Sequence, residues 1–253
     1  MRRHPSVPQP AATRARGWTR LAFALALLPA RPAPALDLSE LLAGVATNER
    51  FEAPARADVL LTCEPGCDTG GRRAIFLGKG DILYVEVEGG LRALVRPAEI
   101  LTLEGGKAVP AKVGTAIGDT DVLLEDLAPF TAESLKLPQI SDEGTTEVVV
   151  TAAPSHPSSY VLIVHTIDPA QRLIVKTQYY RDWVGNLVKM RRATDMVEVG
   201  GHRRPGTITL ENFRRGTTTR LALTWRAAPD APAALFEPGG LSRPSGLDWP
   251  DAK

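Results

Sequence analysis

The sequence contains little cysteine and histidine, with two cysteines and four histidines in 253 residues. Two cysteines cannot close a tetrahedral zinc site, and no Cys or His pair follows Cys63 and Cys67 at zinc-finger spacing. None of the Gly-x-Ser-x-Gly, His-Glu-x-x-His or glycine-rich phosphate-loop motifs occurs. Ser155, Ser158 and Ser159 lie near a histidine in a proline-rich loop, but no acid is paired with them there. We therefore expect no metal, no cofactor and no catalytic residue, and hence a protein that is not an enzyme.

Acidic residues are absent from the first 35 positions, which carry six of the 30 Lys and Arg. The apolar run in this segment, residues 21–28, is too short to span a bilayer, and Ala33-Pro34-Ala35 has the small-x-small form of a signal-peptidase site. The pattern predicts a signal peptide over residues 1–35, cleaved after Ala35, and export to the periplasm. An uncleaved amphipathic leader is the alternative. No cysteine lies near the end of the apolar run, where a lipoprotein signal requires one, so we expect the exported protein to carry no lipid anchor.

The remaining chain is acidic, because 24 Lys and Arg face 29 Asp and Glu, a net charge of −5. This balance argues against nucleic acid as a partner. We expect a single domain over residues 36–245 and a flexible C-terminal tail over residues 246–253. In an oxidising compartment Cys63 and Cys67 can form a short disulfide across the intervening turn, although two free thiols are the alternative.

Hydrophobic periodicity predicts one helix followed by many strands. Apolar residues recur at helical spacing from Leu38 to Val45, and Asp37 with Glu40 has the spacing of a capping box. Beyond residue 57 short runs rich in β-branched residues alternate with glycine-containing turns. A short helix is expected within residues 119–130, and residues 137–159 are expected to form a mobile connection with one strand inside it.

The second half of the chain alternates most clearly. Residues 173–192 predict two strands joined at Asp-Trp-Val-Gly-Asn, and residues 217–226 predict a strand with one apolar face and one polar face. A strand of that kind belongs to an antiparallel sheet. Residues 229–246 are rich in proline and glycine, and no strand is expected there.

The order of these features resembles the periplasmic outer-membrane lipoprotein-sorting family, a LolA-like group. The residues that carry the resemblance are Tyr179, Tyr180, Gly185, Lys189, Pro205, Gly216, Thr217, Thr219, Phe236 and Leu241, together with Asp121, Asp126 and Leu127. The resemblance covers roughly residues 115–245. It implies a mainly β fold, an incomplete antiparallel β-barrel (half-barrel) with helices covering an apolar concave face that receives acyl chains.

A carrier of this kind needs an apolar lining, because each buried methylene contributes about 0.8 kcal/mol. The candidate ligand-binding residues are Phe76, Leu83, Val85, Leu221, Leu223 and Trp225. The alternative is that they pack against Leu41, Leu42 and Leu124 as an ordinary core. A further group of cations in the second half suits either lipid head groups or solvated strand faces: Arg181, Lys189, Arg191, Arg192, Arg203, Arg204, Arg214 and Arg215.

The predicted function is a periplasmic carrier of lipoproteins or other lipidic cargo. The alternative is an accessory or regulatory module on the same fold that senses lipids or lipoproteins beside a membrane exporter. The expected partners are lipoprotein acyl chains or other lipid, with an inner-membrane transporter or an outer-membrane acceptor for exchange. We expect a monomer.

Overall fold

The computed structural model describes residues 36–67 and 71–249, so the predicted signal peptide lies outside the described residues. Helix α1 (Leu38–Glu49) comes first and is followed by the strands of one sheet. The strands are β1 (Phe51–Glu64), β2 (Arg72–Gly80), β3 (Ile82–Val87), β4 (Arg92–Val95), β5 (Ile100–Glu104), β6 (Lys107–Pro110), β7 (Leu135–Glu143), β8 (Val148–Pro154), β9 (Leu162–Asp168), β10 (Leu173–Tyr180), β11 (Leu187–Val199), β12 (His202–Asn212) and β13 (Thr217–Ala227). Short 3₁₀ helices are η1 (Leu124–Leu127), η2 (Ala132–Ser134), η3 (Ala233–Phe236) and η4 (Pro238–Gly240).

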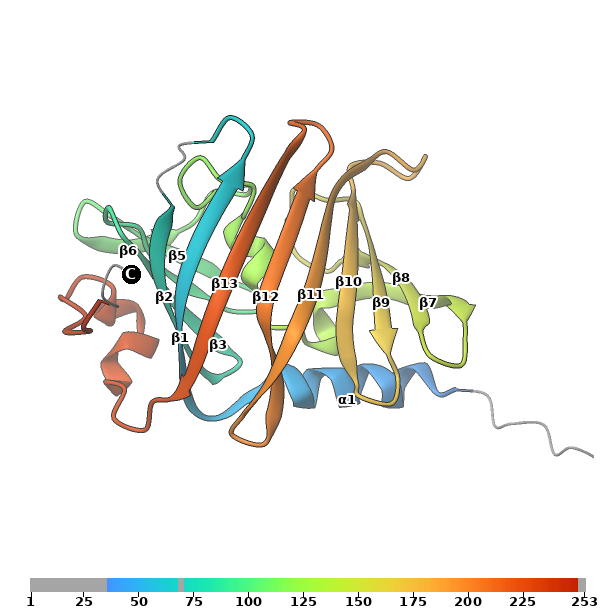
Figure 1. Cartoon of the computed structure of the whole chain (residues 1–253), viewed down its shortest axis with the longest axis horizontal. Helices are drawn as coiled ribbons and strands as arrows, with labels where there is room; N and C mark the ends of the chain where they lie inside the picture. The colour runs from blue at the N-terminus through green and yellow to red at the C-terminus, as the bar shows by residue number, and fades with distance from the viewer. Residues whose placement is uncertain (1–35, 68–70, 250–253) are drawn as a thin grey trace, which may run out of the picture. The chain divides into compact units, whose positions relative to one another are not determined.

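All 13 strands join one antiparallel sheet in the order β6-β5-β4-β3-β2-β1-β13-β12-β11-β10-β9-β8-β7 (Figure 1). Among the strands of the described residues, only β1 and β13 pair although they are distant in sequence, and their register pairs Val59 with Leu223 and Leu61 with Leu221. The two edge strands, β6 and β7, are not paired with each other in the described residues, so the sheet is not closed. The predicted incomplete antiparallel barrel is confirmed.

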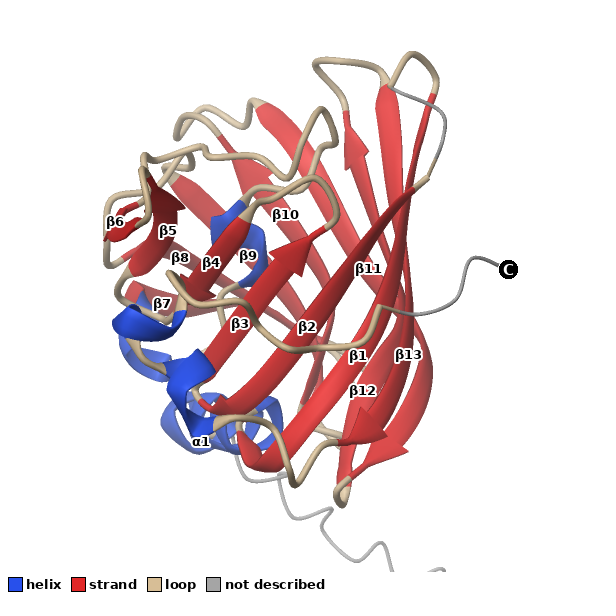
Figure 2. Ribbon diagram, turned by 90° about the vertical axis from the view of Figure 1, so that its left-hand side faces the viewer, coloured by secondary structure: helices blue, strands red, loops and turns tan. Residues whose placement is uncertain are grey.

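The sheet curves, and its inner face carries the main apolar cluster (Figure 2). Strand β13 shows why: Thr219, Leu221 and Leu223 are buried on one face, whereas the residues between them are exposed. The segment between β6 and β7, residues 111–134, crosses this inner face and includes η1 and η2. Its Ile117, Val122 and Leu124 belong to the same buried cluster as the strands. We call residues 111–134 the covering segment.

Helix α1 covers the inner face in the other half of the sheet. Its Leu41, Leu42 and Val45 pack with Val150 of β8 and Ile167 of β9, among others. Asp37 caps the helix, because its carboxylate accepts hydrogen bonds from the backbone N–H groups of residues 39 and 40. The predicted helix and its N-terminal cap are therefore present. The Glu40 side chain approaches Arg172 at 3.6 Å.

Residues 137–159 differ from the prediction of a mobile connection. The structure contains a hairpin here, in which β7 pairs with β8, and β8 then pairs with β9. Strand β7 was missed because it is an edge strand, interrupted by Pro138 and by two register shifts, with most of its side chains exposed. Proline, bulges and exposed polar residues are common on sheet edges and mask the alternation by which strands are recognised.

The proline- and glycine-rich C-terminal segment contains no strand, as expected, but part of it packs into a core. Leu235, Phe236 and Leu241 pack against the outer face of β2–β5, where Leu77 and Tyr84 are fully buried. Because Tyr84 alternates with Leu83 and Val85 of the inner face, its side chain points outward, into this second core. Leu247 and Trp249, which begin the predicted tail, pack partly against the same cluster.

Candidate functional site

A cavity of about 460 Å³ lies between the inner face of the sheet and the elements that cover it. Phe76, Leu83, Leu223 and Trp225 line it, which places four of the six predicted ligand-binding residues on its wall. The covering segment contributes Leu124, Leu127 and neighbouring residues, and the loop before β9 closes another side. The cavity therefore has an apolar wall and a cover made of loops.

The other two predicted residues, Val85 and Leu221, do not line the cavity. Both have no exposed surface and pack in the main apolar cluster with Leu124. Their side chains point to the inner face of the sheet, as predicted, but the covering segment packs over them there. Leu41 and Leu42 belong to a separate cluster beneath α1, so they do not pack against the candidate residues as the alternative assumed.

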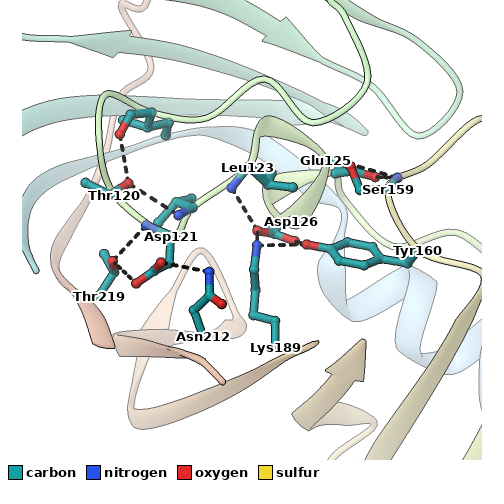
Figure 3. A network of polar contacts seen from close by, with 12 residues as sticks. Thr120, Asp121, Leu123, Glu125, Asp126, Ser159, Tyr160, Lys189, Asn212 and Thr219 are labelled. Atoms are coloured by element: carbon teal, nitrogen blue, oxygen red, sulfur yellow. Dashed lines mark hydrogen bonds and ion pairs between the residues drawn. The ribbon is translucent and has the colours of Figure 1, made fainter. Parts of the chain in front are cut away.

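A buried polar network ties the covering segment to the sheet (Figure 3). The Lys189 ammonium on β11 donates to Asp126 Oδ2 at 2.7 Å and to the Tyr160 hydroxyl at 2.8 Å. Tyr160 in turn donates to Asp126 Oδ1 at 2.7 Å, and the Leu123 N–H donates to Oδ2 at 2.8 Å. The side chains of Lys189 and Asp126 are only 5% and 1% exposed. Such a pair is held by its hydrogen bonds, because each buried charge would be costly alone.

Burial perturbs the acid–base groups of this network. It raises the pKa of Asp126, an effect opposed by the Lys189 ammonium and by the Tyr160 hydroxyl. Burial and the neighbouring Asp126 carboxylate raise the pKa of the Tyr160 phenol, which therefore stays protonated and donates its hydrogen bond. Tyr179 stacks on Tyr160 with ring centroids 4.4 Å apart, and burial raises its pKa as well.

A second carboxylate, near the middle of the covering segment, also attaches this segment to the sheet. Asp121 accepts from the hydroxyls of Thr217 at 2.9 Å and Thr219 at 3.0 Å, and from the Asn212 amide at 3.0 Å. Arg215 adds an ion pair at 3.1 Å. The two carboxylates that belong to the family resemblance, Asp121 and Asp126, thus contact strand residues that also belong to it, although these residues are distant in sequence. These contacts indicate that several residues of the resemblance have a structural role, because they attach the covering segment to the sheet.

The cluster of cations in the second half does not form one surface. Lys189 and Arg204 are buried, contrary to the interpretation of solvated strand faces, whereas Arg192 is exposed beside Glu211. Arg204 holds the C-terminal end of α1, since its guanidinium donates to the carbonyls of Asn48 at 2.6 Å and Arg50 at 2.7 Å. Burial lowers the pKa of Arg204. Arg191 lines the cavity.

Sequence reasoning missed a polar row on the cavity wall. His165, Thr177 and Arg191 line the cavity from β9, β10 and β11. The Nδ1 atom of His165 lies 3.1 Å from the Thr177 hydroxyl. Alternation within β11 could have placed Arg191 on the same face as Lys189, but the pairing of three strands is not visible in the sequence.

Cys63 and Cys67 are joined in a disulfide, and their Cα atoms are 5.4 Å apart. Within the residues that the structure describes, no three His, Cys, Asp or Glu side chains cluster as they would around a metal ion. No helix in this part of the chain is long and apolar enough to cross a membrane. Ser158, one of the loop serines, donates its hydroxyl to Glu125.

Solved structures with the same fold include examples from three organisms. An outer membrane lipoprotein-sorting protein domain, as it is described, from Vibrio parahaemolyticus matches with a TM-score of 0.68 at 16% identity, over 81% of this chain and 97% of that one. A LolA superfamily protein from Nitrosomonas europaea gives 0.64 at 17% identity, over 80% and 98%. A DUF1329 family protein from Desulfovibrio piger gives 0.67 at 15% identity, over 79% and 96%.

These likenesses establish the fold, which is LolA-like. A comparison with curated proteins finds none that matches. A model of a family described as "Uncharacterized protein" matches residues 110–243, which include the covering segment from its start and every strand from β7 to β13. Because that match spans more than half of the sequence, the chain belongs to this family, and it has the fold of the LolA superfamily.

Proposed function

We propose that the chain is a periplasmic binding or carrier protein for lipoproteins or other acylated cargo, and that it acts in outer-membrane lipoprotein sorting. The observation that carries this proposal is the cavity of about 460 Å³ between the inner face of the sheet and its cover. This volume falls within the range of roughly 300–1,000 Å³ typical of small-ligand sites. The printed descriptions of two structural neighbours, a lipoprotein-sorting domain and a LolA superfamily protein, support the same class.

The apolar wall suits an acyl chain. Phe51, Phe76, Leu83, Leu223 and Trp225 all face the same space. Burial of ten methylenes would contribute roughly 8 kcal/mol, which corresponds to micromolar affinity before the entropic cost of association is subtracted. Binding of this kind needs no catalytic group, and we propose a function without catalysis.

Entry of a ligand requires the cover to move, and its attachment is local. The covering segment is held by two carboxylates, Asp121 and Asp126, and by the packing of η1. No backbone pairing with the central strands needs to break for the loops over the cavity to separate from the sheet. We propose that cargo passes beneath this cover during exchange with an inner-membrane transporter or an outer-membrane acceptor.

Native mass spectrometry of protein purified gently from the periplasm tests the function. Acyl lipid should co-purify, and an apolar fluorophore should displace it while changing the Trp emission, to which Trp225 on the cavity wall contributes. A protein partner bound to a chain with an empty cavity would favour the accessory module instead. Failure of both the native lipid and the fluorophore to bind would refute the carrier.

Export is tested separately on the same material. N-terminal sequencing should begin at or near Leu36, and the protein should fractionate with the periplasmic contents without a lipid anchor. A chain that begins at Met1, or that fractionates wholly with membranes, would contradict the proposed signal peptide.

A further inference from the structure

One wall of the cavity is apolar, and the facing wall carries a row of polar side chains. Its wall on β2, β3 and β13 consists of Phe76, Leu83, Leu223 and Trp225. Its wall on β9, β10 and β11 includes His165, Thr177 and Arg191 instead. Thr177 lies directly opposite His165 in the β9–β10 register and directly opposite Arg191 in the β10–β11 register. The three polar residues therefore form a continuous row across adjacent strands.

The Arg191 side chain differs from those of Lys189 and Arg204, because it has neither an acid nor a backbone carbonyl as its partner. Lys189, two residues earlier, pairs with Asp126, and Arg204 donates to two backbone carbonyls. By contrast, the Arg191 side chain forms no ion pair or hydrogen bond with any of residues 36–67 and 71–249, and its Nε is buried without an acceptor. A partly buried guanidinium without an acceptor is costly, and an anion that pairs with it reduces that cost.

The rest of the row is neutral. His165 is buried, and burial together with the Arg191 charge lowers its pKa to about 3. An uncharged imidazole hydrogen bonded to the Thr177 hydroxyl adds dipoles but no charge. The row of His165, Thr177 and Arg191 therefore presents a single positive charge among hydrogen-bonding groups, which suits one anionic group.

We propose that Arg191 binds the anionic head group of a single-chain lipid, whose acyl chain lies along the apolar wall formed by β2, β3 and β13. The ligand class is an acyl or alkyl chain that ends in a carboxylate or a phosphate. A planar guanidinium binds either group through two parallel hydrogen bonds. This inference rests on the proposed function and adds the charge and the orientation of the ligand.

Three ligands with the same chain length separate the head group from the chain. Palmitate carries a carboxylate, hexadecyl phosphate carries a phosphate, and hexadecanol is neutral. Dissociation constants at pH 8 are measured with delipidated protein through the Trp fluorescence, below the concentration at which each ligand aggregates. The variants are Arg191→Met, Arg191→Lys and the control Arg192→Met, which removes an exposed arginine from the opposite face of the same strand.

The wild type should bind at least one acidic ligand about tenfold more tightly than hexadecanol or better, the factor expected for a hydrogen bond to a charged group. Arg191→Met should abolish that preference and leave hexadecanol binding within about twofold of wild type, whereas Arg191→Lys should keep part of it. Arg192→Met should change neither. The acidic ligand that binds more tightly identifies the head group as carboxylate or phosphate.

Two results would overturn the inference in distinguishable ways. If the wild type binds all three ligands equally, or if Arg191→Met weakens all three equally, the cavity holds acyl chains without recognising a head group, and the proposed function stands. If the wild type binds none of them, the proposed function fails and the head-group site fails with it. Thermal unfolding of each variant shows whether a lost affinity reflects a lost fold.

Discussion

Replacement of Lys189 by methionine tests whether the buried ion pair holds the cover on the sheet. The substitution keeps an unbranched side chain of similar length and removes the ammonium. Asp126 Oδ2 then loses its charge partner at 2.7 Å, but keeps its hydrogen bonds from Tyr160 and from the Leu123 N–H. A carboxylate that is 1% exposed cannot recover this interaction from solvent.

The expected loss is large because both partners are buried. Removal of one partner of a buried pair costs about 3–5 kcal/mol, and the two remaining donors to Asp126 favour the lower end of that range. For a chain of this size each kcal/mol lowers the melting temperature by about 2–4 °C, so Lys189→Met should melt about 6–20 °C below the wild type. The loss should shrink at low pH, where Asp126 takes up a proton and no buried charge remains.

Urea unfolding of a double-mutant cycle measures the pair itself. Asp126→Asn combined with Lys189→Met leaves a neutral acceptor for Tyr160 and no charge, so the double variant should be more stable than the sum of the single losses predicts by about 1–3 kcal/mol. Lys136→Met, an exposed lysine on β7, is the matched control and should lose almost nothing. Additive losses, or a Lys189→Met variant as stable as the control, would show that the ion pair does not stabilise the cover.

Three further predictions concern the cavity and the turn. Leu223→Phe should weaken binding of an apolar fluorophore and lower the free energy of unfolding by less than about 1 kcal/mol. The outward-facing Thr224→Phe should leave binding unchanged. A loss of about 1–3 kcal/mol in Leu223→Phe would indicate a close-packed core instead of a cavity. The pKa of His165 is about 3 in the folded protein and 6.5 in the unfolded chain, so the unfolded state takes up the proton first as the pH falls. The free energy of unfolding should therefore drop by up to about 1.4 kcal/mol per pH unit between pH 6.5 and pH 3. Urea titrations of His165→Gln should lack this component, and equal slopes in both proteins would contradict it. Unreduced periplasmic protein should show no alkylatable thiol at Cys63 or Cys67, and reduction should cost less than the roughly 3 kcal/mol expected for a 15-residue loop.

Local patterns were sufficient to predict most of the strands and the helix. In β13 every second residue from Thr217 to Leu223 is buried, as the alternation of apolar and polar residues indicated. Asp37 marked the start of α1 because a carboxylate at that position satisfies free backbone N–H groups. Strand β7 was missed because an edge strand with proline and exposed side chains lacks that alternation. In each of these cases the prediction succeeded or failed on the pattern of neighbouring residues along the chain.

The site could be predicted only in part because it depends on contacts between distant segments. The sequence indicates which face of β13 is apolar, but not that the covering segment lies over Leu221 and leaves Leu223 beside a cavity. Tyr84 alternates with the inward-facing residues of β3, and its burial by the C-terminal segment cannot be inferred from its own strand. The Lys189–Asp126 pair likewise joins residues 63 positions apart.

The cover and the proposed head-group site share strand β11. Lys189 and Arg191 are two residues apart, so both side chains point to the inner face, and their Cα atoms are separated by about 7 Å. Lys189 carries the charge that holds Asp126 of the covering segment, and Arg191 carries a charge without a partner in the described residues. An anion bound at Arg191 therefore lies close to the attachment of the cover and adds negative charge beside the Lys189–Asp126 pair. Because Coulomb interactions at this distance are weakly screened in a buried site, we expect an acidic ligand to change the stability of that attachment, whereas a neutral chain of equal length acts only through packing.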